Sequence, residues 1–327
     1  MIITRTPYRI SLFGGGTDFP EWYSENKGAV LSFTLDKFCY ISVRKLPPFF
    51  DHSYRVSYSK IETTRSAKEI EHPAVREAIL RYFPHHGLEI HHHGDLPARS
   101  GVGSSSAFAV GLIHALLKLE KNTKITAELL AHESIALERD ILNENVGTQD
   151  QIACSYGGLN YIEFSGGQNA WQVNNLYLTR DQKSLLESNL FLVYSGLSRI
   201  SSDITAGTIS ENLSRRRILN KLVSIAEQGK NIIDSNSSLE SFGELLHESW
   251  ILKQQLNPLS ITTELSEMYE NGLKAGALGG KVLGAGGGGF MLFWVPDKKR
   301  ARFKRFVKSY VHVPFAIEAT GTTCILP

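Results

Sequence analysis

The stretch Asp95-Leu-Pro-Ala-Arg-Ser-Gly-Val-Gly-Ser-Ser-Ser-Ala-Phe108 decides the fold of this chain. It is a loop of small residues that follows a strand-like run at 88–93 and leads into an apolar helical run at 107–119. This arrangement binds phosphate, because the first N–H groups of a helix lack intrahelical partners and the helix dipole adds positive charge there. Gly101 and Gly103 also let the backbone approach an anion closely. The stretch therefore predicts a phosphate loop.

The serines that close this loop add hydroxyl groups. Ser104, Ser105 and Ser106 can cap the helix or offer oxygen to phosphate or a metal ion. The loop is not Gly-x-Gly-x-x-Gly, because Ser106 stands at the third glycine, and it is not a Walker loop, because no Gly-Lys-Ser/Thr follows. A capped helix after a tight turn explains the loop equally well, so other stretches must decide.

Composition restricts the class of protein. The 327 residues suffice for two domains, and 42% hydrophobic with 21% charged residues is ordinary for a globular chain. A net charge of +2 gives no support for a nucleic-acid or membrane-surface partner. Three scattered cysteines suit a reducing compartment, and neither a signal peptide nor an apolar run of about 18 residues is present. We expect a cytoplasmic protein.

A second glycine-rich turn follows the first strand. Residues 1–13 predict a strand that is interrupted at Thr6-Pro7, and Gly14-Gly-Gly-Thr-Asp18 follows it directly. The glycines permit a sharp turn with Asp18 at its mouth. The structural alternative for Asp18 is an Asx turn or the N-cap of a short helix at 20–26.

The rest of the first half predicts a mixed sheet with helices. Strands are expected at 29–35, 38–44 and 54–58, helices at 66–83 and 126–143, and a hairpin at 159–164 and 171–178. The three histidines 91–93 cannot all bind one ion, because successive side chains of a strand point to opposite faces. Asp150 lies between two glutamines in Gly147-Thr-Gln-Asp-Gln151, so we expect a partly buried carboxylate that serves either structure or chemistry.

The second half predicts helices over a small sheet. Strands are expected at 189–194, 290–295 and 313–318, helices at 215–235, 239–256, 262–277 and 297–311, and a glycine-rich turn at 279–289. Arg199 lies in a polar loop and can reach a substrate phosphate, a role for which Arg55, Lys37 and Arg99 compete. The run of arginines at 215–217 is interpreted as a solvated helix face.

Three stretches together carry a resemblance. In order, they are Arg9-Ile-Ser-Leu-Phe-Gly-Gly-Gly-Thr-Asp18, the loop 96–106, and Lys281-Val-Leu-Gly-Ala-Gly-Gly-Gly-Gly289. They resemble the three motifs of the GHMP small-molecule kinases, which include galactokinase, homoserine kinase and mevalonate kinase, and the resemblance spans nearly the whole chain. The Gly-Gly-Gly-Thr-Asp form is most similar to the branch that acts on heptose phosphates and fucose.

The resemblance implies an α+β fold. An N-terminal α/β domain similar to ribosomal protein S5 domain 2, at 1–180, would be followed by a ferredoxin-like α+β domain at 181–327. ATP and the acceptor would meet in the cleft between them. The implied activity is ATP-dependent phosphorylation of the anomeric hydroxyl of D-glycero-D-manno-heptose 7-phosphate, which gives heptose 1,7-bisphosphate for GDP-heptose synthesis.

The resemblance also implies roles for single residues. Asp150 takes the catalytic position with Arg9 as its basic partner, and Mg²⁺ falls to Ser105 and Glu138, with Ser104 or Ser106 open if the serines shift by one. The residues implied at the ATP phosphates are Arg99, Gly101, Val102, Gly103, Ser104, Ser105 and Ser106. Those implied at the acceptor are Gly15, Gly16, Thr17, Asp18 and Arg199. The last motif is expected to brace the phosphate loop.

One departure from galactokinases restricts which sugars are expected as the acceptor. Galactokinases carry Glu-His where this chain has Gly15-Gly16, and the missing side chains argue against galactose. A kinase for a free sugar such as fucose stays an alternative, as does a non-catalytic ATP- and sugar-binding sensor, although the complete set of site residues argues against a sensor. An RNA-binding protein with the S5-type domain is disfavoured by the near-neutral charge. We expect a small sugar phosphate as partner, neither nucleic acid nor membrane, and a homodimer stays open.

Overall fold

A nine-stranded sheet and a four-stranded sheet organise the part of the chain that the computed structural model describes, residues 1–121, 124–167, 170–197, 213–235, 238–258 and 261–326. The large sheet has the order β13-β1-β2-β5-β3-β4, with β12 and β6 also paired to β2 and β7 paired to β6. Its strands are β1 (Ile2–Phe13), β2 (Gly28–Lys45), β3 (Tyr54–Ser57), β4 (Ile61–Thr64), β5 (Leu88–Gly94), β6 (Leu159–Phe164), β7 (Trp171–Leu176), β12 (Ile317–Glu318) and β13 (Thr323–Leu326).

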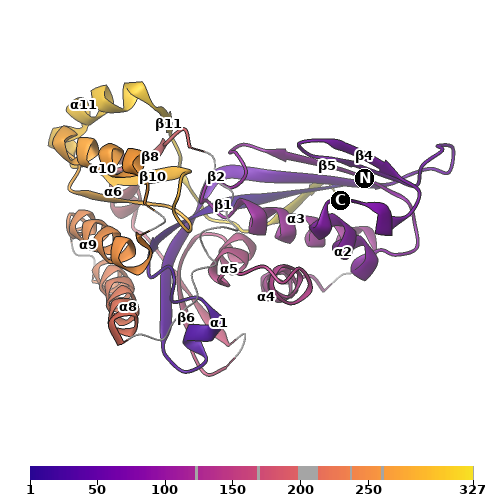
Figure 1. Cartoon of the computed structure of the whole chain (residues 1–327), viewed down its shortest axis with the longest axis horizontal. Helices are drawn as coiled ribbons and strands as arrows, with labels where there is room; N and C mark the ends of the chain where they lie inside the picture. Colours follow the sequence, from indigo (N-terminus) through magenta and orange to yellow (C-terminus); the bar gives the residue numbers. More distant parts are fainter. Residues whose placement is uncertain (122–123, 168–169, 198–212, 236–237, 259–260, 327) are drawn as a thin grey trace.

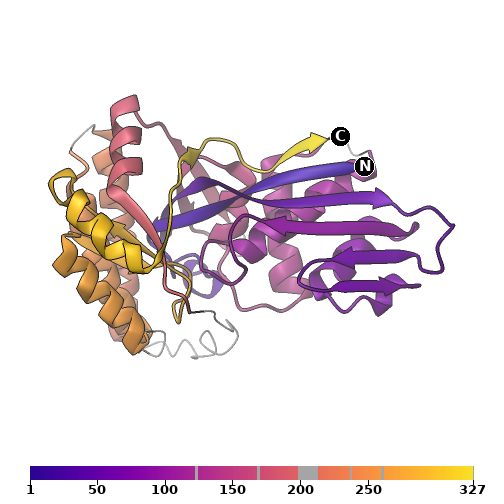
Figure 2. The same cartoon turned by 90° about the horizontal axis from the view of Figure 1, so that it is seen from above.

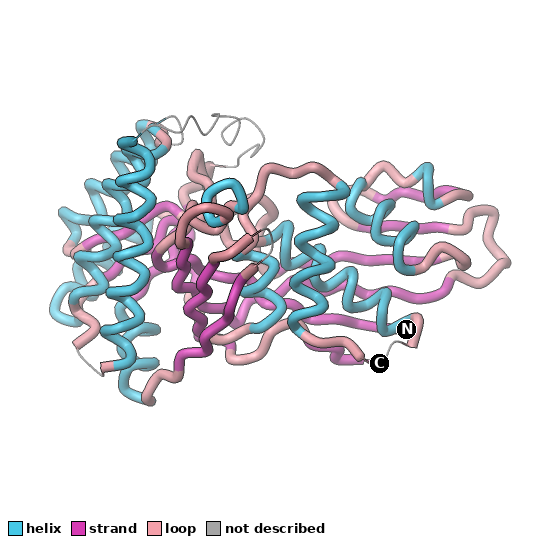
Figure 3. The backbone as a smooth tube through the Cα atoms, turned by 90° about the horizontal axis from the view of Figure 1, so that it is seen from below, coloured by secondary structure: helices cyan, strands magenta, loops and turns pink. Residues whose placement is uncertain are grey.

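Helices of the first half cover one face of the large sheet. They are α1 (Pro20–Tyr23), α2 (Pro73–Tyr82), α3 (Ser104–Leu119), α4 (Ala127–Ile135) and α5 (Gln149–Tyr156). Helix α3 packs on β1 and β2 and is almost wholly apolar, which suits a helix inserted between the sheet and other helices. Figure 3 shows these helices over the sheet, and Figure 2 shows the strands on the opposite side.

The small sheet has the order β11-β8-β10-β9 and is entirely antiparallel. Its strands are β8 (Leu190–Tyr194), β9 (Gly279–Val282), β10 (Phe290–Trp294) and β11 (Val311–Val313), and the helices of this half are α6 (Arg180–Asn189), α8 (Leu213–Asp234), α9 (Ser241–Leu256), α10 (Thr263–Ala275) and α11 (Asp297–Phe306). Helix α9 packs on β9 and α8 packs on β2, so the second half lies against the end of the large sheet (Figure 1). The α+β fold class is thereby confirmed.

Several predicted boundaries were wrong for identifiable reasons. The two strands expected at 29–35 and 38–44 are one strand, β2, whose centre pairs with β12. The helix expected at 66–83 is a short 3-10 turn, η1 (Ala67–Glu69), followed by α2, because Pro73 disfavours helical backbone before it. Helix α6 was missed, although Thr179 and Gln182 form a capping box in the sequence.

The end of the chain returns to the first sheet. The strand expected at 313–318 divides at Pro314 into β11, which joins the small sheet, and β12, which joins the large one. Strand β13 then pairs with β1, opposite Ile3 and Arg5, so the two termini lie close together (Figures 1 and 2). Strands β12 and β13, which come late in the chain, therefore belong to the large sheet. The division into domains at residue 180 stays a prediction.

Candidate active site

The phosphate loop connects β5 to α3 through two glycines with left-handed backbone. Gly101 has φ +86° and Gly103, the N-cap of α3, has φ +73°. No side chain caps the helix, so the expectation that the serines cap it was wrong. The hydroxyl of Ser104 instead accepts a hydrogen bond of 3.0 Å from the backbone N of Arg99 and closes the loop on itself. The first N–H groups of α3 are therefore left for an anion.

The third glycine-rich motif packs directly against this loop. The backbone N of Phe290 donates to the carbonyl of Ser100 at 3.0 Å. A Cβ added at Gly101 would lie 2.4 Å from the carbonyl oxygen of Leu283, and one at Gly289 would lie 2.3 Å from that of Ser100. Glycine is thus required on both sides of the contact, and the last motif braces the phosphate loop as predicted.

Arg9 joins the phosphate loop to Asp150. Its Nε and Nη2 donate to Oδ1 and Oδ2 of Asp150 at 2.7 and 2.5 Å, and its Nη1 donates to the carbonyl of Gly101 at 2.6 Å. The Arg9 side chain is only 4% exposed, whereas that of Asp150 is 23% exposed. A two-bond arginine pair fixes the carboxylate and stabilises its charge, while the exposed part stays open to a reactant.

Helix α5 places Asp150 in its first turn, where the helix dipole favours a negative charge. A Cβ at Gly103 would lie 3.4 Å from Oδ2 of Asp150, so the carboxylate lies against the phosphate loop. The pairing of Arg9 with Asp150 that the sequence predicted is found in the structure.

Glu138 receives hydrogen bonds from the serines of the phosphate loop. Ser105 Oγ donates to Oε1 at 2.6 Å, Ser106 Oγ to Oε2 at 2.8 Å, and Gln151 Nε2 to Oε2 at 2.5 Å. Glu138 lies on η2 (Ala136–Ile141), a π-helical turn that continues α4 and that sequence analysis did not foresee. Such turns recur at functional sites.

Burial raises the pKa of Glu138 to about 7, while its three hydrogen bonds oppose the rise. A buried carboxylate beside hydroxyl oxygens is a donor set that Mg²⁺ accepts. Ser105 is exposed and Ser106 is buried, so Ser105 is the hydroxyl that an incoming ion can reach. The residues therefore fit the predicted magnesium site, and their role as ligands stays a prediction.

Asp18 is fully buried beside Asp150. The backbone N of Gly16 donates to Oδ1 at 2.9 Å and that of Gln149 to Oδ2 at 3.3 Å. Burial raises the pKa of Asp18, and the negative charge of Asp150 raises it further. The N-cap of α1 is Phe19, without a side-chain hydrogen bond, so Asp18 does not cap that helix.

Gly147 has a function at this turn that sequence analysis missed. A Cβ at position 147 would lie 1.9 Å from Oδ2 of Asp18, so only glycine leaves room for the carboxylate. Thr17 anchors the same turn, because its hydroxyl donates to the carbonyls of Gly14 and Ala29 at 2.8 and 3.0 Å. Its predicted contact with the acceptor stays a prediction.

Two buried polar atoms near Gly15 lack partners among the described residues. They are Oγ of Ser11 and Oε1 of Gln149. A Cβ at Gly15 would lie 3.2 Å from that Ser11 oxygen and 3.5 Å from Nε2 of Gln149. Buried polar groups are normally hydrogen-bonded, so this niche beside Asp18 suits a hydroxyl group of a ligand. No sequence pattern pointed to Ser11 or Gln149.

Two lysines of the second half reach this region. Lys281 on β9 is buried and donates from Nζ to the carbonyl of Leu12 at 3.0 Å. Burial lowers the pKa of Lys281 to about 7, and the charge of Arg9 lowers it further. Lys253 on α9 donates to the carbonyl of Val282 at 3.0 Å and also to that of Gly284, so it fixes the bracing loop.

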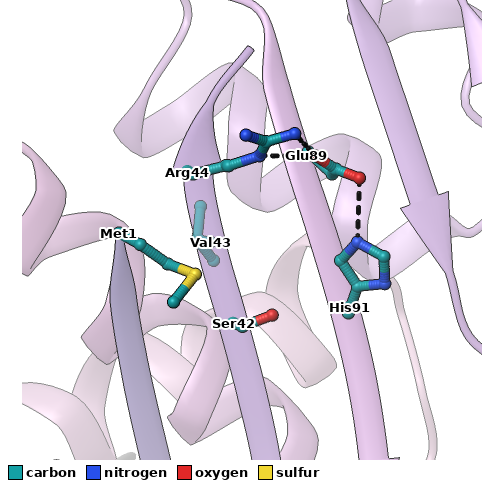
Figure 4. Close-up of a pocket in the computed structure, with 6 residues that line it drawn as sticks. All are labelled: Met1, Ser42, Val43, Arg44, Glu89 and His91. Carbon is teal, nitrogen blue, oxygen red and sulfur yellow. Dashed lines mark hydrogen bonds and ion pairs between the residues drawn. The ribbon is translucent and has the colours of Figure 1, made fainter. Parts of the chain in front are cut away.

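Two cations that the sequence offered for a substrate phosphate have acidic partners in the structure. Arg55 pairs with Glu89 at 3.6 Å in a strand neighbouring β5, and Lys37 pairs with Asp36 at 2.8 Å. Figure 4 shows the surface hollow on the sheet in which Arg44 and His91 hold the same Glu89. Both side chains are engaged in pairs of their own, and contact of either with a substrate phosphate stays a prediction. Arg199 lies outside the described residues.

His91 and His92 on β5 have different neighbours, as the alternation of side chains along a strand requires. His91 faces Glu89, at 3.0 Å, whereas His92 packs edge-on against Phe108 of α3, with ring centroids 5.1 Å apart. The two side chains therefore lie on opposite faces of β5.

In the described part of the chain, no helix is both long and apolar enough to cross a membrane.

Two family models match the chain. Residues 58–158 match the GHMP kinases N terminal domain, and residues 230–312 match the GHMP kinases C terminal domain. Together the two matches cover more than half of the chain and include the phosphate loop, Glu138, Asp150 and the bracing loop.

Two curated proteins and one solved structure illustrate the similarity. The D-glycero-alpha-D-manno-heptose 7-phosphate kinase of Campylobacter jejuni is 28% identical over an alignment of 324 residues that covers 95% of this chain and 95% of that protein. The bifunctional fucokinase/GDP-fucose pyrophosphorylase of Arabidopsis thaliana is 25% identical, over 90% of this chain and 30% of that protein. A crystal structure described as a D-glycero-D-manno-heptose 1-phosphate kinase from Bacteroides thetaiotaomicron has a TM-score of 0.80 at 21% identity, over 100% and 99% of the two chains.

Proposed function

The chain belongs to the GHMP kinases and is an ATP-dependent sugar kinase, and we propose that its acceptor is the anomeric hydroxyl of D-glycero-D-manno-heptose 7-phosphate. The product would be the 1,7-bisphosphate, a precursor for nucleotide-heptose synthesis. The observation that carries the proposal is the placement of Asp150, bonded to Arg9 against the phosphate loop, next to the buried carboxylate of Asp18.

The reacting groups have separate tasks in this proposal. The first N–H groups of α3 and the backbone from Gly101 to Ser106 hold the ATP phosphates. Asp150 orients the acceptor hydroxyl and takes its proton, and Arg9 stabilises the carboxylate and the charge on the transferred phosphoryl group. Phosphoryl transfer needs mainly positioning and charge stabilisation, and both are available here.

Ser105 and Glu138 would hold Mg²⁺, whose chemistry is to neutralise charge on the β- and γ-phosphates. The acceptor would lie on the other side of Asp150, at the glycine turn. There Asp18, Ser11 and Gln149 would offer hydrogen-bonding groups to sugar hydroxyls.

The proposed acceptor is supported by a relative that aligns over nearly its full length. The alignment with the Campylobacter jejuni protein covers 95% of that protein at 28% identity, and its name specifies a heptose 7-phosphate. The match to the fucokinase protein keeps a free sugar as the alternative acceptor.

The experiment is an ATP-consumption assay with a panel of acceptors. The panel contains D-glycero-D-manno-heptose 7-phosphate, mannose, fucose, galactose and N-acetylgalactosamine. Asp150→Asn tests the base, and Asp140→Asn is a matched control, because Asp140 is an exposed residue of η2. We expect turnover of the heptose phosphate only, a loss of about 10²- to 10⁴-fold in kcat for Asp150→Asn, and no change for Asp140→Asn. Turnover of a free sugar instead would contradict the acceptor, and an active Asp150→Asn enzyme would contradict the base.

A further inference from the structure

Three consecutive arginines, 215–217, lie near the start of helix α8, and their surroundings differ. Arg216 pairs with Glu25 at 3.8 Å and Arg217 is exposed. Arg215 is half-buried, and its Nε is shielded from solvent without a hydrogen-bond acceptor among the described residues. Burial lowers the pKa of Arg215, and no nearby anion opposes this in the described part of the chain. The sequence interpretation of 215–217 as a uniformly solvated face was wrong for Arg215.

A shielded guanidinium N–H without an acceptor is costly. Leaving a charged donor unpaired away from water costs more than leaving a neutral one, because it loses its hydration without compensation. Oxyanions are the natural partners of arginine, since its planar fork matches phosphate and carboxylate oxygens. The Nε–H group of Arg215 is therefore available to an anionic ligand, which would supply the missing acceptor.

Helix α8 carries Arg215 toward the acceptor turn, the glycine turn at 14–18 where the acceptor is proposed to bind. Leu219 follows Arg215 by four residues and therefore lies next to it on the same helix face. The Cδ2 atom of Leu219 lies 3.8 Å from the Cβ position of Gly16, and that of Leu256 on α9 lies 3.6 Å from it. Gly16 in turn donates its N–H to Asp18. Arg215 is therefore one helical turn from Leu219, which lies against this glycine turn.

Other cations around this turn already have partners. Arg139 bonds to Glu21 at 2.5 Å and to the carbonyl of Val146. Lys27 bonds to Glu227 at 2.7 Å, and Lys281 donates to Leu12. Arg9 is occupied by Asp150 and the phosphate loop. Of the described cations named here, Arg215 is the one whose shielded N–H group has no hydrogen-bond acceptor.

We propose that Arg215 binds the distal phosphate of a phosphorylated sugar acceptor, at the end of the molecule opposite the reacting hydroxyl. The inference rests on the proposed function, and it names the residue that would distinguish a sugar phosphate from the free sugar. Arg215 acts through binding in this assignment and takes no part in phosphoryl transfer.

The test compares Arg215→Gln with Arg217→Gln, which removes the same charge from an exposed neighbour. Initial rates are measured with D-glycero-D-manno-heptose 7-phosphate, mannose 6-phosphate and mannose. For Arg215→Gln we expect a rise of about 10- to 100-fold in KM for the phosphorylated acceptor that the parent uses, as for the loss of a hydrogen bond to a charged group. The KM for ATP should stay unchanged, and Arg217→Gln should behave as the parent does. Arg215→Lys should recover part of the loss, because it keeps the charge without the fork.

The outcomes separate this inference from the acceptor proposal. If the parent uses the heptose phosphate and Arg215→Gln leaves its KM unchanged, or Arg217→Gln shows the same rise, the inference is overturned and the function stands. If the parent prefers mannose 6-phosphate and Arg215→Gln raises that KM, the heptose assignment falls and Arg215 keeps its role. If the parent uses only unphosphorylated sugar, both are overturned. An equal loss of kcat/KM for mannose and for its phosphate in Arg215→Gln would indicate a structural defect and would also overturn the inference.

Discussion

Replacing Gly147 with alanine should remove acceptor binding without touching the ATP side of the site. The backbone of Gly147 lies outside the left-handed region, so alanine is compatible with its conformation. The new Cβ would nevertheless lie 1.9 Å from Oδ2, 2.6 Å from Cγ and 3.2 Å from Oδ1 of Asp18. The effect of the substitution is therefore a steric displacement of one carboxylate.

The size of the effect follows from these distances. Ordinary van der Waals contact begins at 3.4 Å, so the carboxylate of Asp18 has to retreat by about 1.5 Å. Its hydrogen bonds to Gly16 and Gln149, at 2.9 and 3.3 Å, do not survive such a shift. Misplacement of a substrate-positioning group by about 1 Å costs about 100-fold in rate, or roughly 2.7 kcal/mol of transition-state stabilisation. We expect a loss of that order in kcat/KM for the acceptor.

Steady-state kinetics with both substrates are the assay. The KM for ATP should be unchanged, because the phosphate loop is held by Arg9 and the bracing loop, not by Gly147. Asp18→Ala provides the control: once the carboxylate is gone, adding Gly147→Ala should have little further effect, so the two losses are strongly non-additive. A Gly147→Ala enzyme within about threefold of the parent in kcat/KM, or additive losses in the double variant, would refute the reasoning.

Two further predictions concern the lysines. Lys253→Met removes the bonds from α9 to Val282 and Gly284, so the bracing loop loosens against Gly101; the KM for ATP should rise several-fold while that for the acceptor stays constant. Lys281→Met should raise the free energy of unfolding most at or below pH 7, because burial lowers the pKa of Lys281 to about 7 from 10.5 and the folded parent there holds a buried charge. The gain in free energy of unfolding should fade between pH 7 and 10.5, where the lysine is protonated only in the unfolded chain. Urea titrations of the parent and of Lys281→Met at pH 6 and 10 measure the gain. The same stability difference at both pH values would contradict this prediction.

Local sequence patterns predicted those parts of the site that lie within one short segment of the chain. The strand, small-residue loop and apolar helix around Gly101 lie in one segment, and they are present with a helix that starts three residues earlier than expected. The pairing of Arg9 with Asp150 and the contact of Ser105 with Glu138 came from the resemblance, since those residues lie 141 and 33 positions apart. Their catalytic and metal-binding roles stay predictions.

Contacts that depend on tertiary packing could not be predicted. Nothing in the sequence around Gly147 shows that Asp18 packs against it, and the polar niche of Ser11 and Gln149 exists only because two distant segments meet at Gly15. The return of β13 to β1 is equally invisible, because a short strand of mixed character carries no signal about its partner. Arg215 was misinterpreted for the same reason: a run of like charges does not show which member faces inward.

The two carboxylates of the site differ in burial and in their partners, which fits the separate tasks proposed for them. Asp150 is partly exposed, accepts hydrogen bonds from Nε and Nη2 of Arg9 and lies in the first turn of α5, so it is fixed in place and can be reached by a reactant. Asp18 is buried, its pKa is raised by burial and then by Asp150, and backbone N–H groups hold it in place. Two neighbouring carboxylates repel each other, so the one without a paired arginine has the greater cost of charge. We infer that Asp150 takes the proton, whereas Asp18 fixes the acceptor through hydrogen bonds, which it can make in either protonation state.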